Sequence, residues 1–261
     1  MRKFIKLLSA LLIIALIFNM TGCKKQDKAQ KKPQTSQKTE IPKELTKIEK
    51  DIEKIISEAK KIKEKPSSTS SKKDSDKDKK KEISTNEKSW KEIEKTVKDI
   101  HSNWNSLNPI VTKKGAKLNL INSMSAAIND LTLVANKKSK IDVLIYANGV
   151  YKYIPELEGL FSTDPSLDIK KLKFYGQDID FKSEIQKWDE ISKDLMDINS
   201  TWQTLKVKLP KEAKSTAEKF EVSISELQKT VKSQNKVLTK VKAEVFLKNL
   251  KSLEKVLEPK K

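Results

Sequence analysis

Few residues in this sequence have the types and spacing that catalysis requires. The chain contains one histidine, His101, and one cysteine, Cys23. A single histidine excludes a histidine-based metal cluster and a serine–histidine–aspartate triad built from the usual residues. The run Asp178-x-Asp180-x-x-x-Glu184 partly matches a calcium loop, but it lacks the loop glycine and the full spacing, which favours a cap at a helix N-terminus. We therefore predict no enzyme, no metal site and no bound cofactor.

A polar ligand cleft is the remaining candidate for a site inside the body of the protein. All four tyrosines lie between residues 146 and 175, and asparagine is also more frequent in this half of the body. Amides and phenols on helical faces are suited to line such a cleft, although drift after a duplication would produce the same bias. The candidate cleft residues are Asn148, Gly149 and Tyr151, because small residues there would leave a gap between helices.

Cys23 is explained by the residues that precede it. Residues 1–6 carry three cations, and residues 7–18 form an apolar run that is short for a permanent membrane span. The run leads into Thr21-Gly22-Cys23. This arrangement resembles bacterial lipoprotein signal peptides, in which a small residue precedes a cysteine that becomes diacylated. The resemblance covers residues 1–23 only, and it implies a signal peptide over 1–22 and a diacylglycerol on Cys23.

The charge of the chain bears on its partners. It contains 55 basic and 36 acidic residues, and every basic residue except Arg2 is a lysine. Specific recognition of bases and phosphates usually relies on the planar fork of arginine, so we expect no specific nucleic-acid partner. The lysine excess is compatible with a composition bias that has no functional meaning. It is equally compatible with a diffuse surface for a polyanion such as a wall polymer or anionic lipid heads.

Two segments have too few apolar residues to fold on their own. Residues 23–42, which begin with the lipidated cysteine, form a predicted disordered tether, and residues 66–83 form a predicted disordered linker of Lys, Ser and Asp. Between them, residues 43–65 are predicted to form a helix with a heptad seam. That helix either docks on the rest of the chain or self-associates between chains through 41–62. Its seam consists of Ile41, Leu45, Ile48, Ile52, Ile55, Ala59 and Ile62.

The body contains an internal repeat. The stretch from Trp90 to Leu107 returns 98 residues later, from Trp188 to Leu205, with 9 of 18 positions identical. In both copies the large apolar residues are spaced by three and four, which places them on one face of a helix. We predict that the tryptophans are core residues; an exposed aromatic platform for sugars is the alternative.

The predicted fold is all-α, with two tandem three-helix units over 84–163 and 176–261. Capping signals at Ser84 and Ser139, and breaks at Pro109 and Pro165, set the helix boundaries. In the second unit the first helix is expected to extend from Asp178 through Phe181 and onward past Trp188.

The expected function combines these features. We predict a lipoprotein attached to the cell membrane on its extracytoplasmic face, whose helical body binds a partner or acts as a spacer. The expected partners are the membrane, through the lipid, and an envelope protein or anionic polymer. The alternatives are a cationic binder of wall polymers or anionic lipids, or a cell-envelope enzyme.

Overall fold

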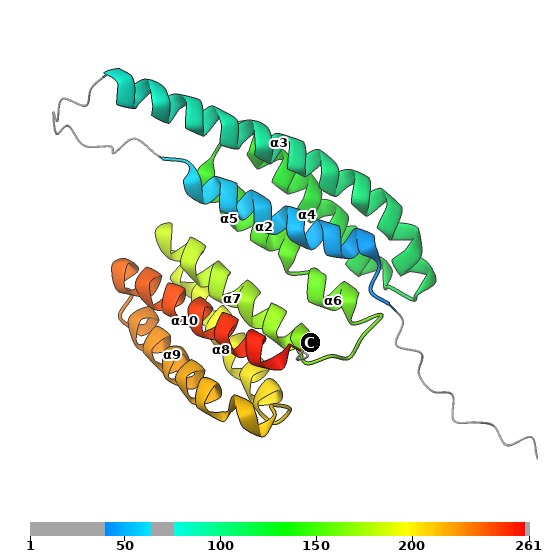
Figure 1. The fold of residues 1–261 in the computed structure, drawn as a ribbon, viewed down its shortest axis with the longest axis vertical. Coiled ribbons are helices and arrows are strands. Elements are labelled where there is room, and N and C mark those ends of the chain that lie inside the picture. Colours follow the sequence, from blue (N-terminus) through cyan, green and yellow to red (C-terminus); the bar gives the residue numbers. More distant parts are fainter. Residues whose placement is uncertain (1–39, 64–75, 259–261) are drawn as a thin grey trace, which may run out of the picture. The chain divides into compact units, whose positions relative to one another are not determined.

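The computed structural model describes residues 40–63 and 76–258. Every regular element in these two ranges is helical, which confirms the predicted all-α class (Figure 1). The predicted signal peptide, most of the tether, the last two residues of the predicted helix over 43–65, and residues 66–75 of the predicted linker lie outside the described residues. The elements are α2 (Lys43–Lys61), α3 (Asp76–Lys113), α4 (Leu118–Lys137), α5 (Lys140–Tyr151), α6 (Ile154–Glu158), α7 (Ser166–Glu184), α8 (Trp188–Lys206), the 3-10 turn η1 (Lys211–Ala213), α9 (Lys214–Lys232) and α10 (Lys236–Leu257).

The first bundle is a ring of four helices. α2 packs on α3 and α5, and α4 packs on the same two helices from the other side of the ring. The heptad residues of α2 are fully buried in this core, among them Leu45, Ile48, Ile52 and Ile55. This helix was expected either to dock on its own chain or to self-associate between chains, and in the structure it is docked on its own chain. Burial of this seam stabilises a helix that would be marginal alone in water.

The second bundle is also a ring of four helices. α7 packs on α8 and α10, and α9 packs on α8 and α10. Each predicted three-helix unit is therefore joined by one further helix at its N-terminal side, α2 in the first bundle and α7 in the second. The second bundle begins at Ser166, ten residues before the predicted boundary at 176.

α7 belongs to both hydrophobic cores. Its residues Ile169, Leu172 and Ile179 are part of the core of the second bundle. Phe174 and Phe181 are part of the core of the first bundle. A helix buried on two sides has no polar face, so it lacks the one-sided apolar stripe by which a surface helix is recognised.

The predicted continuous helix through Phe181 and Trp188 is interrupted in the structure. α7 ends at Glu184, Gln186 adopts the left-handed conformation with φ of 57°, and α8 begins at Trp188. Asp178 and Asp180 consequently lie in the C-terminal half of α7 and do not cap a helix N-terminus.

α3 is longer than predicted at both ends. It begins at Asp76, inside the predicted linker, and it continues past Pro109 to Lys113. Proline removes one backbone hydrogen bond and disfavours a helical residue before it. Here the helix tolerates that loss near its end, because Leu107 and Val111 on either side are fully buried. Gly115, with φ of 97°, then turns the chain toward α4.

Two helical glycines should respond oppositely to alanine. A Cβ on Gly176 in α7 would lie 2.5 Å from Phe246 and 2.9 Å from Leu247 of α10, whereas a Cβ on Gly149 in α5 would meet nothing within 4 Å. Gly176→Ala should lower the free energy of unfolding by about 1–3 kcal/mol through overpacking. Gly149→Ala should raise it by about 0.5–1 kcal/mol through helix propensity. Urea unfolding of the two variants measures both effects, and a stabilising Gly176→Ala would contradict the close α7–α10 packing.

Candidate functional site between the two bundles

The predicted cleft residues lie at the contact between the bundles. Asn148 is fully buried, and its amide donates to the Phe174 carbonyl oxygen at 3.1 Å and to Asp178 Oδ1 at 3.3 Å. Tyr151 is also buried, and its hydroxyl donates to Glu49 Oε1 at 3.2 Å. Gly149 is half-buried beside them. Asn148 therefore ties α5 to α7, and Tyr151 ties α5 to α2.

A lysine of α7 extends this contact. Lys170 Nζ donates to Glu49 Oε2 at 2.7 Å and to Glu158 Oε1 at 2.6 Å. Burial raises the pKa of Glu158 against the opposing effect of Lys170. Burial alone would lower the pKa of Lys170, but Glu49 and Glu158 outweigh it and the pKa is raised. A charged network of this kind fixes the relative position of α2, α6 and α7, since removing one member would leave the others buried and unpaired.

A second polar cluster lies where α7 meets α8. Burial, and then the neighbouring carboxylate of Asp178, raise the pKa of Asp194 to about 8. Lys182 Nζ lies 2.5 Å from Asp178 Oδ2 and 3.0 Å from Glu190 Oε2. Near neutral pH Asp194 therefore retains its proton in the fold, because a buried carboxyl group beside a second carboxylate resists ionisation.

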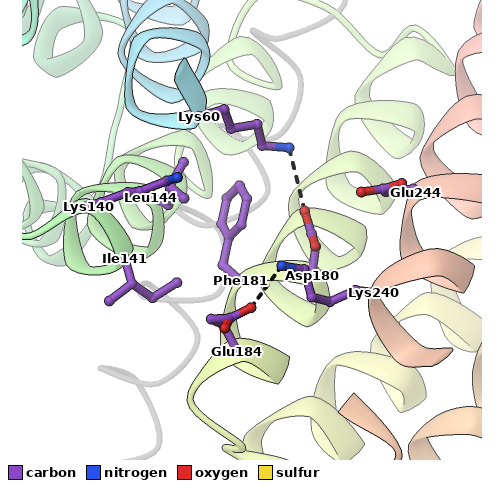
Figure 2. A pocket seen from close by; sticks show the side chains of 9 residues that line it. All are labelled: Lys60, Lys140, Ile141, Leu144, Asp180, Phe181, Glu184, Lys240 and Glu244. Carbon is purple, nitrogen blue, oxygen red and sulfur yellow. Dashed lines mark hydrogen bonds and ion pairs between the residues drawn. The ribbon is translucent and has the colours of Figure 1, made fainter. Parts of the chain in front are cut away.

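An open pocket adjoins this contact, and we refer to it as the inter-bundle pocket. It has a volume of about 330 Å³. Figure 2 shows that residues from α2, α5, α7 and α10 converge on it. Its lining residues are Lys60, Lys140, Ile141, Leu144, Asp180, Phe181, Glu184, Lys240 and Glu244. None of the three predicted cleft residues lines this pocket.

Ion pairs cross the inter-bundle pocket. Lys60 Nζ lies 3.5 Å from Asp180 Oδ2 and 5.1 Å from the centre of the Phe181 ring. Lys240 Nζ lies 2.8 Å from Glu184 Oε2, and Lys236 contacts the other oxygen of the same carboxylate at 2.6 Å. These two lysines lower the pKa of Glu184. Burial raises the pKa of Asp180, against the opposing effect of Lys60.

The two remaining charged residues of the pocket, Lys140 and Glu244, form no ion pair across it within the described part of the chain. Lys140 Nζ donates to the Ile62 carbonyl oxygen at 2.5 Å, which completes the C-terminal end of α2. Glu244 is exposed and makes no hydrogen bond or ion pair with the described residues of the chain. The pocket thus presents ammonium groups, carboxylates and an apolar wall, a combination suited to binding.

Within residues 40–63 and 76–258, no group of three or more histidine, cysteine or acidic side chains is arranged to hold a metal ion. His101 Nε2 lies 2.8 Å from Thr132 Oγ1 of α4, so this ring serves in the contact between α3 and α4.

Sequence reasoning noted Asp180 and Glu184 only as a partial match to a calcium loop, and it did not predict the pocket that they line. The lining residues come from four helices that are far apart in the sequence, and Lys60, Lys240 and Glu244 resemble ordinary surface charges on amphipathic helices. The only available signal was Phe181 beside Asp180, an aromatic ring next to a carboxylate that the structure buries together.

The described helices were also compared with the requirements for a membrane span. None of them, in the part of the chain that the structure covers, combines the length and apolarity that crossing a bilayer requires. No protein-family model, no curated protein and no solved structure matches this chain.

Proposed function

We propose that this protein is a lipoprotein anchored to the extracytoplasmic face of the cell membrane, whose two-bundle body is a binding module. The observation that carries the proposal is the apolar run over 7–18 that leads into Thr21-Gly22-Cys23, in a chain without another cysteine. A diacylated cysteine supplies two acyl chains, which together hold a protein stably on a bilayer where one chain does not.

The inter-bundle pocket supports the choice of a binding module over a plain spacer. A spacer needs only length and rigidity, whereas this body has a pocket formed jointly by α2, α5, α7 and α10. Ligand pockets are commonly found at such junctions between packed units. The charges and the apolar wall of the pocket are described above, and they favour noncovalent binding of a small molecule.

Replacing Cys23 by alanine should abolish membrane attachment. The variant has no thiol to accept the diacylglycerol, so it should lose the lipid and either remain unprocessed or appear in the soluble fraction. Membrane fractionation and mass spectrometry of the expressed protein measure both properties. The wild-type chain should carry a lipid adduct on residue 23 and sediment with membranes.

Ser102→Ala, a substitution in the body, serves as the control and should leave lipid content and sedimentation unchanged. If Cys23→Ala retained the mass and membrane partition of the wild-type protein, the anchoring proposal would be refuted.

A further inference from the structure

The inter-bundle pocket has an apolar side and a charged side. Figure 2 shows Ile141 and Leu144 of α5 opposite Asp180 and Glu244, with the ring of Phe181 between them. A volume of about 330 Å³ lies at the lower end of the range found for small-molecule sites. The apolar side, formed by Ile141, Leu144 and the Phe181 ring, is suited to a short aliphatic group.

The acidic side of the pocket has unused capacity for a positive charge. Asp180 is 6 % exposed, yet its ion pair with Lys60 is long, at 3.5 Å. Burial raises the pKa of Asp180, Lys60 and Lys240 oppose this effect, and the charge of Glu244 adds to it by repulsion. Glu244 makes no hydrogen bond or ion pair with the described residues, although its charge also acts on Lys240. A ligand ammonium placed between Asp180 and Glu244 would donate to both carboxylates and offset this repulsion.

The basic side of the pocket lies on the first bundle. Lys60 comes from the end of α2, and Lys140 comes from the start of α5. The side chain of Lys60 is 48 % exposed, and among the described residues its ammonium is held only by the long pairing with Asp180 and by the face of the Phe181 ring. A ligand carboxylate beside Lys60 would replace the long ion pair between Lys60 and Asp180. The ligand ammonium would then pair with Asp180 in place of Lys60.

The charge balance of the lining favours a ligand with no net charge. Three lysines and three acidic residues line the inter-bundle pocket. A ligand anion or cation alone would leave one sign unpaired, whereas adjacent opposite charges on the ligand would satisfy both sides. The distance of 3.5 Å between Lys60 and Asp180 requires these two ligand charges to be close together.

We propose that the inter-bundle pocket binds a small zwitterion, an α-amino acid with a short aliphatic side chain. Its ammonium lies between Asp180 and Glu244, its carboxylate lies beside Lys60 and Lys140, and its side chain packs on Ile141, Leu144 and Phe181. This inference rests on the binding role proposed above and names its ligand class.

Three matched probes test the ligand class on the full chain purified in detergent. They are L-leucine, 4-methylpentanoate, which lacks the ammonium, and 3-methylbutylamine, which lacks the carboxylate. Isothermal titration calorimetry should detect L-leucine, and each analogue should bind at least about tenfold more weakly, because one set of charged hydrogen bonds is lost. Equal affinity for either analogue, or no binding of L-leucine, would overturn the proposal.

Two carboxylate substitutions on α10 test the location. Glu244→Gln, at an exposed position, should fold normally and weaken L-leucine binding several-fold. Glu254→Gln, on the same helix and outside the lining, should bind like the wild-type chain. Equal effects of the two variants would overturn the assignment of the ligand to this pocket. Membrane fractionation is read separately, so an anchored chain that fails to bind L-leucine refutes this inference and leaves the anchor intact.

Discussion

Replacing Trp202 by alanine should lower the free energy of unfolding by about 3–5 kcal/mol, the usual cost of truncating a buried tryptophan. Trp202 is 2 % exposed in the centre of the second bundle. Its ring meets Phe220 of α9 edge-on, with centroids 5.0 Å apart, and Phe220 in turn meets Phe246 of α10 at 4.8 Å. Removing the indole would therefore leave a cavity among three helices.

Trp104 is the matched residue of the first bundle, and phenylalanine distinguishes the two sites. The indole of Trp104 donates to Ser125 Oγ at 2.9 Å. The indole N–H of Trp202 is buried and makes no hydrogen bond of ordinary geometry, although it contributes to lowering the pKa of Glu221. Trp104→Phe should therefore cost more stability than Trp202→Phe, because only the first substitution removes a formed hydrogen bond.

Hydrogen exchange during urea unfolding locates these effects. Trp202→Ala should reduce protection mainly in α8, α9 and α10, and Trp104→Ala mainly in α3, α4 and α5. Two results together would contradict the core assignment of these rings: alanine variants with nearly unchanged free energies of unfolding, and tryptophan fluorescence of the parent protein that indicates solvent-exposed indoles. They would favour the alternative of an exposed aromatic platform for sugars.

Asp194→Asn should make the stability of the protein less sensitive to alkaline pH. The pKa of Asp194 is raised in the fold from an ordinary value of 3.8 to about 8. Between these values the unfolded chain has released the proton while the folded chain retains it. The contribution of this group to stability is therefore complete below about pH 4 and is lost as the pH rises through about 8. Asparagine stays neutral, so the variant escapes this loss.

Urea unfolding at pH 5 and pH 9 measures this change. The stability of Asp194→Asn relative to the wild-type protein should be markedly higher at pH 9 than at pH 5. At pH 9 the wild-type chain must carry the buried charge of Asp194 beside Asp178, whereas the asparagine stays neutral. Asp189→Asn, an exposed substitution on the same helix, is the control and should follow the wild-type pH profile. Parallel pH profiles for Asp194→Asn and the wild-type protein would refute the raised pKa of Asp194.

Sequence patterns predicted the helices that have one polar face. The apolar stripes of α2, α3 and α8 are clear because water covers the opposite side of each helix, and these stripes are buried in the structure. The burial of Trp104 and Trp202 was predictable for the same reason, since each lies on such a stripe. The all-α class followed from these patterns together with the low glycine content.

The patterns failed where two bundles share a helix. In α7, the apolar residues Ile179 and Phe181 point to different cores, and they alternate along the chain with the buried polar residues Asp178 and Asp180. No helical period distinguishes such a segment from a loop. The candidate site could not be predicted either, because Lys60 and Glu244 acquire a common environment only through the packing of the two bundles. Asn148 was identified as unusual, but its role as a link to α7 depended on that same packing.

The sharing of α7 also constrains the order in which the protein can assemble. A chain that emerges N-terminus first presents α2 through α6 before residues 166–184 are available. Until then, the surface that Phe174 and Phe181 cover remains in contact with water, and Asn148 and Glu158 lack their partners on α7. The first bundle consequently matures only after α7 arrives, which leaves an interval in which the nascent intermediate is open to chaperones and to mispairing with other chains.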